Sequence, residues 1–128
     1  MYISLSLFKR LSMSWHSIRE LSLSASNEIS ASVETGLDSP WFSGHFPGDP
    51  ILPGIAQLAM VFEAIEQGCD RKFTVSGVRR VKFRQIVRPD VHMRVVVAPL
   101  GNYSYSFRLM AAGEPACKGI IEVSPANS

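Results

Sequence analysis

This chain of 128 residues has no long apolar run, only two cysteines and a small net charge. No apolar run reaches the roughly 18 residues that span a bilayer, so we expect no membrane-spanning segment. Cys69 and Cys117 lie far apart and belong to no CxxC or Cys/His cluster, which predicts two reduced packing residues and no metal site. A formal charge of +2 is too small to favour nucleic-acid binding.

The composition and length of the chain predict one globular domain. Hydrophobic residues make up 46% of the chain and charged residues 19%, values typical of a single compact domain of this length. We expect residues 1–20 to be an N-terminal extension and residues 21–128 to form the domain. Lys9 and Arg10 follow the first apolar residues instead of preceding them, which is not the pattern of a secretory signal and predicts a cytoplasmic protein. Met13 is a second candidate start.

Alternating side chains predict most of the secondary structure. From Leu21 to Val33, odd positions are mainly apolar and even positions are serine or glutamate, which predicts one long strand with one wet face. Residues 35–53 are rich in Gly, Pro, Ser and Asp and predict a long loop of the kind that often carries function. Four more strands are predicted, at residues 74–86, 91–100, 103–110 and 116–123.

One helix is predicted between the loop and these strands, over residues 54–68. Pro53 suits its first helical position and Gly68 suits its end. The segment is apolar nearly all round, so the helix is expected to be buried, with Glu66 and Gln67 solvated near its exit. The result is an α+β fold in which an antiparallel sheet wraps one central helix.

The segment "HFPGDPILPG", residues 45–54, holds the candidate chemistry. Prolines fix φ and stiffen the chain around His45, and histidine is the side chain best suited to act as a base near neutral pH. Gly54 offers an unpaired N–H at the positive end of the helix dipole, where a carbonyl oxygen can bind. The alternative for His45 is a loop residue bonded to a nearby carbonyl. His16 and His92 lack such a setting and are interpreted as structural or surface residues.

The stretch "GHFPGDPILPG", a buried helix and then "GVRRVKFRQIVRPD" resemble the 3-hydroxyacyl-(acyl carrier protein) dehydratases of fatty acid synthesis over residues ~20–123. The resemblance implies the hot-dog fold and no metal or organic cofactor. It implies dehydration of a (3R)-3-hydroxyacyl thioester, held on the phosphopantetheine of an acyl carrier protein, to a trans-2-enoyl thioester. It also makes His45 the base and Gly54 the carbonyl-binding N–H. The stretch "IAQLAMV" is similar to a branch linked to aryl polyene and other specialised lipid pathways.

One position departs from that family. Its members carry a Glu or Asp five residues after the glycine, as the acid that helps the hydroxyl leave, and here Ala59 stands there. Three substitutes are open: Glu63, one turn later on the helix; His45 returning its own proton; or a carboxylate from a different hot-dog chain. Glu63 has an alternative role as an ion-paired structural residue.

The remaining site predictions concern substrate and partner. We expect the substrate to be lined by Phe46, Pro53, Gln57 and Ala59. Gln57 could orient substrate or water, or could satisfy a backbone group. A basic stretch is predicted to dock an acidic carrier protein, unless it is only a solvated strand face. Its residues are Arg79, Arg80, Lys82, Arg84 and Arg88.

We expect a homodimer or a larger assembly such as a trimer of dimers, or a hetero-oligomer with another hot-dog chain, because joining sheets edge to edge protects exposed strands. Two alternatives to a dehydratase stay open. One is a non-catalytic hot-dog subunit that binds acyl thioesters or partners an active chain. The other is an acyl thioesterase, which usually uses a helix carboxylate, so Ala59 counts against it too.

Overall fold

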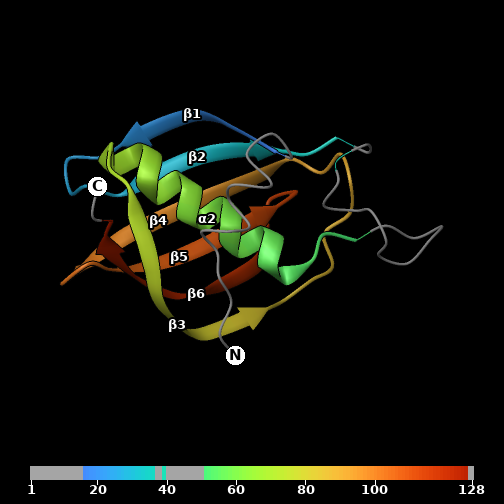
Figure 1. The fold of residues 1–128 in the computed structure, drawn as a ribbon. Coiled ribbons are helices and arrows are strands. Elements are labelled where there is room, and N and C mark those ends of the chain that lie inside the picture. Colours follow the sequence, from blue (N-terminus) through green and yellow to red (C-terminus); the bar gives the residue numbers. More distant parts are fainter. Residues whose placement is uncertain (1–15, 37–38, 40–50, 127–128) are drawn as a thin grey trace.

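The structure is a computed structural model and describes residues 16–36, 39 and 51–126. In this part of the chain one antiparallel sheet of six strands, in the order β1-β2-β4-β5-β6-β3, curves around one helix, α2 (Figure 1). The elements are β1 (Ser17–Leu23), β2 (Ile29–Glu34), α2 (Gly54–Cys69), β3 (Phe73–Phe83), β4 (Met93–Gly101), β5 (Ser104–Ala111) and β6 (Glu114–Pro125). The sequence therefore predicts the helix and the four later strands close to their observed places.

The prediction of one long strand over residues 21–33 is wrong. β1 and β2 are two antiparallel strands, joined by a turn in which the Ser24 N–H donates to the Glu28 carbonyl at 2.9 Å and the Asn27 N–H donates to the Ser24 carbonyl at 3.0 Å. Asn27 has φ 64°, a left-handed conformation that asparagine tolerates better than most residues. Serine and asparagine fit a turn as well as a wet strand face, so alternation alone hides the hairpin. β1 begins at Ser17, so the expected boundary between residues 20 and 21 falls inside a strand.

Helix α2 begins and ends differently in detail from the prediction. Pro53 is the cap before the helix, with φ −66° and ψ 154°, and Gly54 is the first helical residue. Gly68 does not end the helix; Asp70 does, in the left-handed region with φ 49°. A Cβ at Gly68 would lie 2.6 Å from Cδ1 of Ile29. Glycine at that position lets the helix pack closely against β2, and a Cβ there would force Ile29 to shift.

The core lies between α2 and the inward face of the sheet. Met60, Phe62 and Ile65 of the helix are fully covered, and burying a side chain such as Phe62 contributes about 1.5–3 kcal/mol. Alternate residues of the central strands meet them: Met93, Val95, Val97, Phe107, Leu109 and Ala111. The helix is buried on most sides, as its composition predicts.

Glu66 is an exception to the predicted pattern. It is only 6% exposed, and its Oε2 accepts a hydrogen bond from the Phe73 N–H at 2.8 Å. The expectation that it is solvated is therefore wrong, whereas Gln67 is exposed as expected. Glu66 is retained in the interior because it satisfies a backbone donor at the start of β3.

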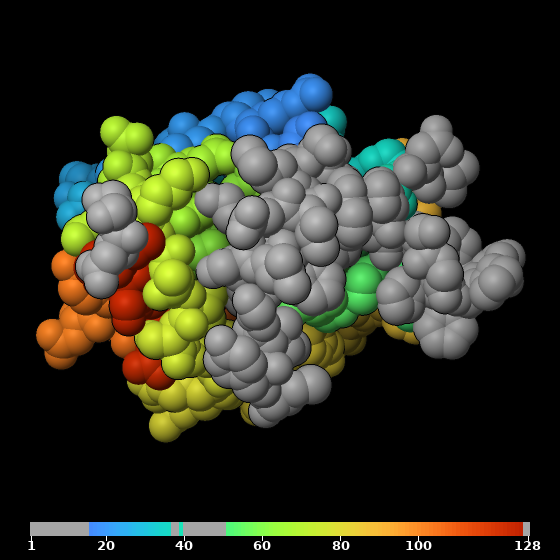
Figure 2. Space-filling model, in the orientation of Figure 1, coloured from blue at the N-terminus to red at the C-terminus, as the bar shows by residue number. Residues whose placement is uncertain are grey.

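β1 and β3 are the two edges of the sheet, and they form opposite rims of the face shown in Figure 2. β3 is the longer edge, with 11 residues, and its ladder with β6 is broken by irregularities after Val75 and after Arg79. On and just beyond β3, Val78, Phe83 and Ile86 are 36%, 52% and 60% exposed. An edge strand with exposed apolar side chains is a surface suited to pairing with another chain.

Candidate active site

The first turn of α2 forms the floor of the candidate site. The N–H groups of Ala56 and Gln57 both donate to the Pro53 carbonyl, at 3.1 and 3.3 Å. Among the described residues, no side chain caps the helix and none bonds to the N–H groups of Gly54 and Ile55, and the first turn carries no acidic residue. Those two donors, at the positive end of the helix dipole, are free to bind a carbonyl oxygen or an oxyanion.

An aromatic ring from the end of β3 lies against Gly54. In Figure 1 the arrowhead of β3 ends beside the first turn of α2, and a Cβ on Gly54 would lie 2.7 Å from Cζ of Phe83. Glycine at this position thus permits the close approach of the Phe83 ring. The ring is half exposed, so it forms part of the surface beside the helix start. The segment before the helix is fixed by a 2.7 Å hydrogen bond from the Leu52 N–H to the Val87 carbonyl.

Gln57, three residues into the helix from Gly54, carries an unsatisfied polar group. Its side chain lies in the interior at 3% exposure, and its Oε1 has no hydrogen-bond partner among the residues that the structure describes. A buried acceptor without a partner costs about 1–3 kcal/mol. The prediction that Gln57 satisfies a nearby backbone group therefore does not hold for Oε1 in the described part of the chain. A hydroxyl donor from a bound molecule would supply the missing hydrogen bond.

Ala59 and Glu63 share one side of α2, about one turn apart. Ala59 is buried and apolar, at 5% exposure. Glu63 already has two contacts: its Oε2 lies 2.7 Å from Nε2 of His16, and its Oε1 accepts from Nε2 of Gln67 at 3.1 Å. The His16 side chain is 1% exposed, so this pair is largely shielded from water. These contacts favour the structural interpretation of Glu63 over its use as a general acid.

His45 and Phe46 lie outside the described residues, so their predicted roles stay predictions. The other predicted members of the site, Pro53, Gly54, Gln57 and Ala59, lie together in the cap and first turns of α2. His92 is exposed and stands near the ends of β1 and β2, as a surface residue. His16 is buried, as a structural residue.

The cysteines supply no nucleophile at the helix start. Both thiols are free, with Cys69 exposed and Cys117 buried, so the prediction of a packing role is wrong for Cys69. Burial raises the pKa of the Cys117 thiol to about 12, which keeps it protonated and unreactive near neutral pH.

In the described part of the chain, no cluster of three or more His, Cys, Asp or Glu side chains could hold a metal ion. No helix there is long and apolar enough to cross a membrane.

The residues of the predicted basic stretch do not form one surface in the structure. Arg79 donates from Nε to Oε1 of Glu122 at 3.3 Å, and Arg88 lies in the segment after β3. Arg80 and Lys82 line one hollow on the face of the sheet opposite α2, and Arg84 lines a second. Two further cations in these hollows, Arg108 and Lys118, come from β5 and β6 and were missed from sequence. Arg108 had a signal, since it alternates with the apolar residues Phe107 and Leu109 in the predicted strand 103–110, but Lys118 depends on strand register.

Comparison with known proteins places these features in a family. Residues 21–120 match the family described as ApeI-like, ApeI dehydratase. A 3-hydroxyacyl-[acyl-carrier-protein] dehydratase FabZ of Nitratidesulfovibrio vulgaris is 26% identical over 116 residues, which covers 77% of this chain and 73% of that protein.

Solved structures share the fold. The dehydratase heterocomplex ApeI:P from Xenorhabdus doucetiae contains a chain with a TM-score of 0.75 and 23% identity, covering 84% of this chain and 96% of that one. A hypothetical thioesterase of Streptococcus pneumoniae, solved with coenzyme A, has a TM-score of 0.61 and 9% identity, covering 98% and 100%. The sheet wrapped around a helix is thus the hot-dog fold that the sequence motifs implied.

The family match covers the helix start, the buried helix and all of the sheet except the outer ends of β1 and β6, so we conclude that this chain belongs to the ApeI-like dehydratase family, as a divergent member with Ala59 at the position of the helix carboxylate.

Proposed function

We propose that this protein removes water from a (3R)-3-hydroxyacyl thioester carried by an acyl carrier protein, giving a trans-2-enoyl thioester for fatty acid or related lipid and polyene synthesis. The observation that supports it best is the uncapped start of α2, where the Gly54 and Ile55 N–H groups have no partner among the described residues. Relatives named as 3-hydroxyacyl-[acyl-carrier-protein] dehydratases support the same substrate class.

In this proposal His45 takes the proton from the carbon next to the thioester carbonyl. Negative charge then builds on the thioester oxygen, and the Gly54 N–H stabilises it. The bond between the third carbon and its hydroxyl oxygen breaks, a double bond forms, and the hydroxyl leaves as water after gaining a proton. No metal or organic cofactor takes part in these steps.

The proton for the leaving hydroxyl needs a source, because Ala59 has none. We favour the imidazolium of His45, which carries the proton just abstracted and can return it. Gln57 would hold the hydroxyl, because its Oε1 lacks a donor and lies buried. Glu63 is the other candidate acid, although His16 and Gln67 already occupy its carboxylate oxygens. A Glu63→Gln variant with an unchanged rate would remove Glu63 from the mechanism and leave the dehydratase proposal standing.

The direct experiment incubates the protein with a 3-hydroxyacyl thioester of an acyl carrier protein and follows products by mass spectrometry. A loss of one water is the expected outcome, and His45→Ala should abolish it. Free acid would indicate a thioesterase on the same fold. An unchanged substrate in the presence of well-folded protein would contradict the proposal.

A second function is a non-catalytic subunit that binds an acyl thioester or partners an active hot-dog chain. Two observations favour it: Ala59 offers no carboxylate, and a chain with the same fold belongs to a dehydratase heterocomplex. Mixing this protein with an active hot-dog chain would then raise the partner's turnover or stability, while the protein alone would turn over nothing. In the leading proposal, by contrast, the protein is a homodimer joined edge to edge and is located in the cytoplasm.

A further inference from the structure

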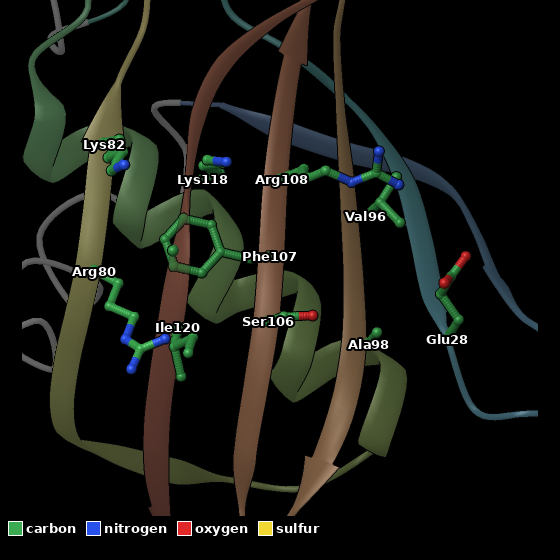
Figure 3. Close-up of a pocket in the computed structure, with 11 residues that line it drawn as sticks. Glu28, Arg80, Lys82, Val96, Ala98, Ser106, Phe107, Arg108, Lys118 and Ile120 are labelled. Carbon is green, nitrogen blue, oxygen red and sulfur yellow. The ribbon is translucent and has the colours of Figure 1, made fainter.

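Three cations stand side by side across adjacent strands on the face of the sheet opposite α2. Lys82 of β3 lies opposite Lys118 of β6, and Lys118 lies opposite Arg108 of β5. Figure 3 shows this row on one side of the sheet with α2 behind it. Directly opposed side chains have Cβ atoms about 4.5–5.5 Å apart, and like charges there are destabilising. None of the three has an ion-pair partner in the described part of the chain.

This row borders a hollow of about 630 Å³. Arg80 adds a fourth cation, and the base of the hollow is formed by small or apolar residues. Glu28 is the one acid among the described residues that line it. The small and apolar residues are Val96, Ala98, Ser106, Phe107, Gly119 and Ile120. A second hollow of about 410 Å³ shares Arg108 and Lys118 and adds Arg84. We call the surface formed by Arg80, Lys82, Arg84, Arg108 and Lys118 the outer-face basic groove.

A β-bulge shapes one side of this groove. Between Arg79 and Lys82, β3 has one more residue than the facing part of β6, and Arg80 takes up a left-handed conformation with φ 57°. That conformation costs a non-glycine residue about 1–2 kcal/mol. Arg80, at the bulge, and Lys82 both line the groove, while Arg79 bonds to Glu122. Strained backbone and opposed like charges together form a local cost of the kind that proteins retain at functional surfaces.

The groove adjoins the candidate active site through one residue. Phe83, whose ring lies against Gly54, stands between Lys82 and Arg84 in the sequence. Successive side chains of a strand point to opposite faces. The end of β3 therefore presents cations to the groove and an aromatic ring to the helix start. A molecule bound in the groove could extend a flexible arm past this end of β3 and reach Gly54.

We propose that the outer-face basic groove docks the acidic surface of the carrier protein that delivers the acyl thioester, an inference that rests on the proposed function. The charge of the groove is complementary to an acidic helix, and its apolar base suits an apolar side chain on such a helix. A second copy of this chain does not fit, because it would bring the same cations to the interface. An extended nucleic acid does not fit a short groove on a chain with a net charge of only +2.

The test compares the double variant Arg108→Gln/Lys118→Gln with a control that loses the same charge elsewhere, Arg19→Gln/Lys72→Gln. Both control residues are exposed and lie outside the groove. The probe is acyl carrier protein bearing phosphopantetheine without an acyl chain, and affinity is measured by calorimetry at low and at high salt. We expect the groove variant to bind about tenfold or more weakly, with a flatter salt dependence, and the control to change by about twofold at most.

Equal affinity of the groove variant and the control would overturn the proposal, and so would a wild-type protein that does not bind the carrier. A change of oligomeric state confined to the groove variant would also overturn it, because it would make this face an interface between copies. Turnover of a 3-hydroxyacyl thioester of free pantetheine, which has no carrier protein, separates the two proposals. If that small substrate is not dehydrated while carrier binding still depends on the groove, the docking surface stands and the proposed chemistry fails.

Discussion

Ala59 limits the chemistry available to this chain, because no other residue at that point of α2 can release a proton. Ala59→Asp should place a carboxyl in an apolar setting, where desolvation favours its protonated form and suits it to act as an acid. General acid catalysis is worth about 10²–10⁴-fold, so turnover of a 3-hydroxyacyl thioester should rise by about tenfold or more. Ala59→Asn, with nearly the same shape and no proton to give, is the control. Equal rates for the two variants would show that the chain supplies its acid elsewhere.

Glu66 contributes to stability in a way that its near neighbour does not. Glu66→Ala leaves the Phe73 N–H without its acceptor, in a place that water reaches poorly. The expected loss is about 1–3 kcal/mol in the free energy of unfolding, measured by urea denaturation. Gln67→Ala, on the exposed side of the same turn, should cost no more than about 0.5 kcal/mol. A similar loss for both variants would refute the role given to the Glu66 carboxylate.

For single residues, the sequence predicts the surroundings of several positions, but it does not predict which distant residues contact each other. The place of Gly54 at the helix start and the burial of Gln57 follow from the proline-rich loop and the apolar helix. The contact of His16 with Glu63 joins residues 47 positions apart, and neither residue type nor local pattern indicates it. Such contacts depend on how β1 packs against α2.

Among the elements, α2 and β2 are held close by the absence of a side chain at Gly68. In an exposed helix, Gly→Ala gains about 1 kcal/mol. Here the added Cβ would overlap with Cδ1 and Cγ1 of Ile29, which is only 2% exposed and would have to shift within a packed core. We therefore expect Gly68→Ala to lose about 1–3 kcal/mol in thermal or chemical unfolding. The loss should shrink in an Ile29→Val background, which removes the nearest methyl group. A gain in stability on Gly68→Ala would contradict this packing.

In contrast to Gly68, the row of cations across β3, β6 and β5 is expected to lower the stability of the folded protein. Lys118 faces a positive charge on each side, so Lys118→Gln should raise the free energy of unfolding by about 0.2–1 kcal/mol, and more at low salt than at high salt. Lys72→Gln, away from the row, should leave stability nearly unchanged. A loss of stability in Lys118→Gln would mean that the lysine packs favourably and that the row carries no strain.

Elements were predictable where one periodic pattern dominated. The helix and β5 stand out because apolar residues recur at a clear period over many positions. The turn between β1 and β2 does not, since its serines continue the polar alternation of the strands. Strand order and register also could not be predicted. The cations of β3 were therefore recognised as one stretch, but their position beside Arg108 and Lys118 was not.

At the scale of the whole molecule, β3 is the edge through which we expect two copies to associate. Val78→Lys places a charge on that edge, where a paired strand would have to desolvate it. Sedimentation equilibrium should show a dimer for the wild-type protein and a monomer for Val78→Lys. Leu100→Lys, at another exposed apolar position near the β4–β5 turn, is the control and should remain dimeric. A monomeric wild-type protein, or a variant that stays dimeric, would exclude β3 as the contact.

The shielded contact between His16 and Glu63 also bears on how this protein should be handled at the bench. The family match begins at residue 21, so an expression clone cut to that homology boundary would delete His16 and leave the Glu63 carboxylate facing a void in the packing. A clone that starts at Met13 would keep the histidine. Misfolding of the shorter clone would then reflect where the gene was cut, and would say nothing about whether the protein is an enzyme.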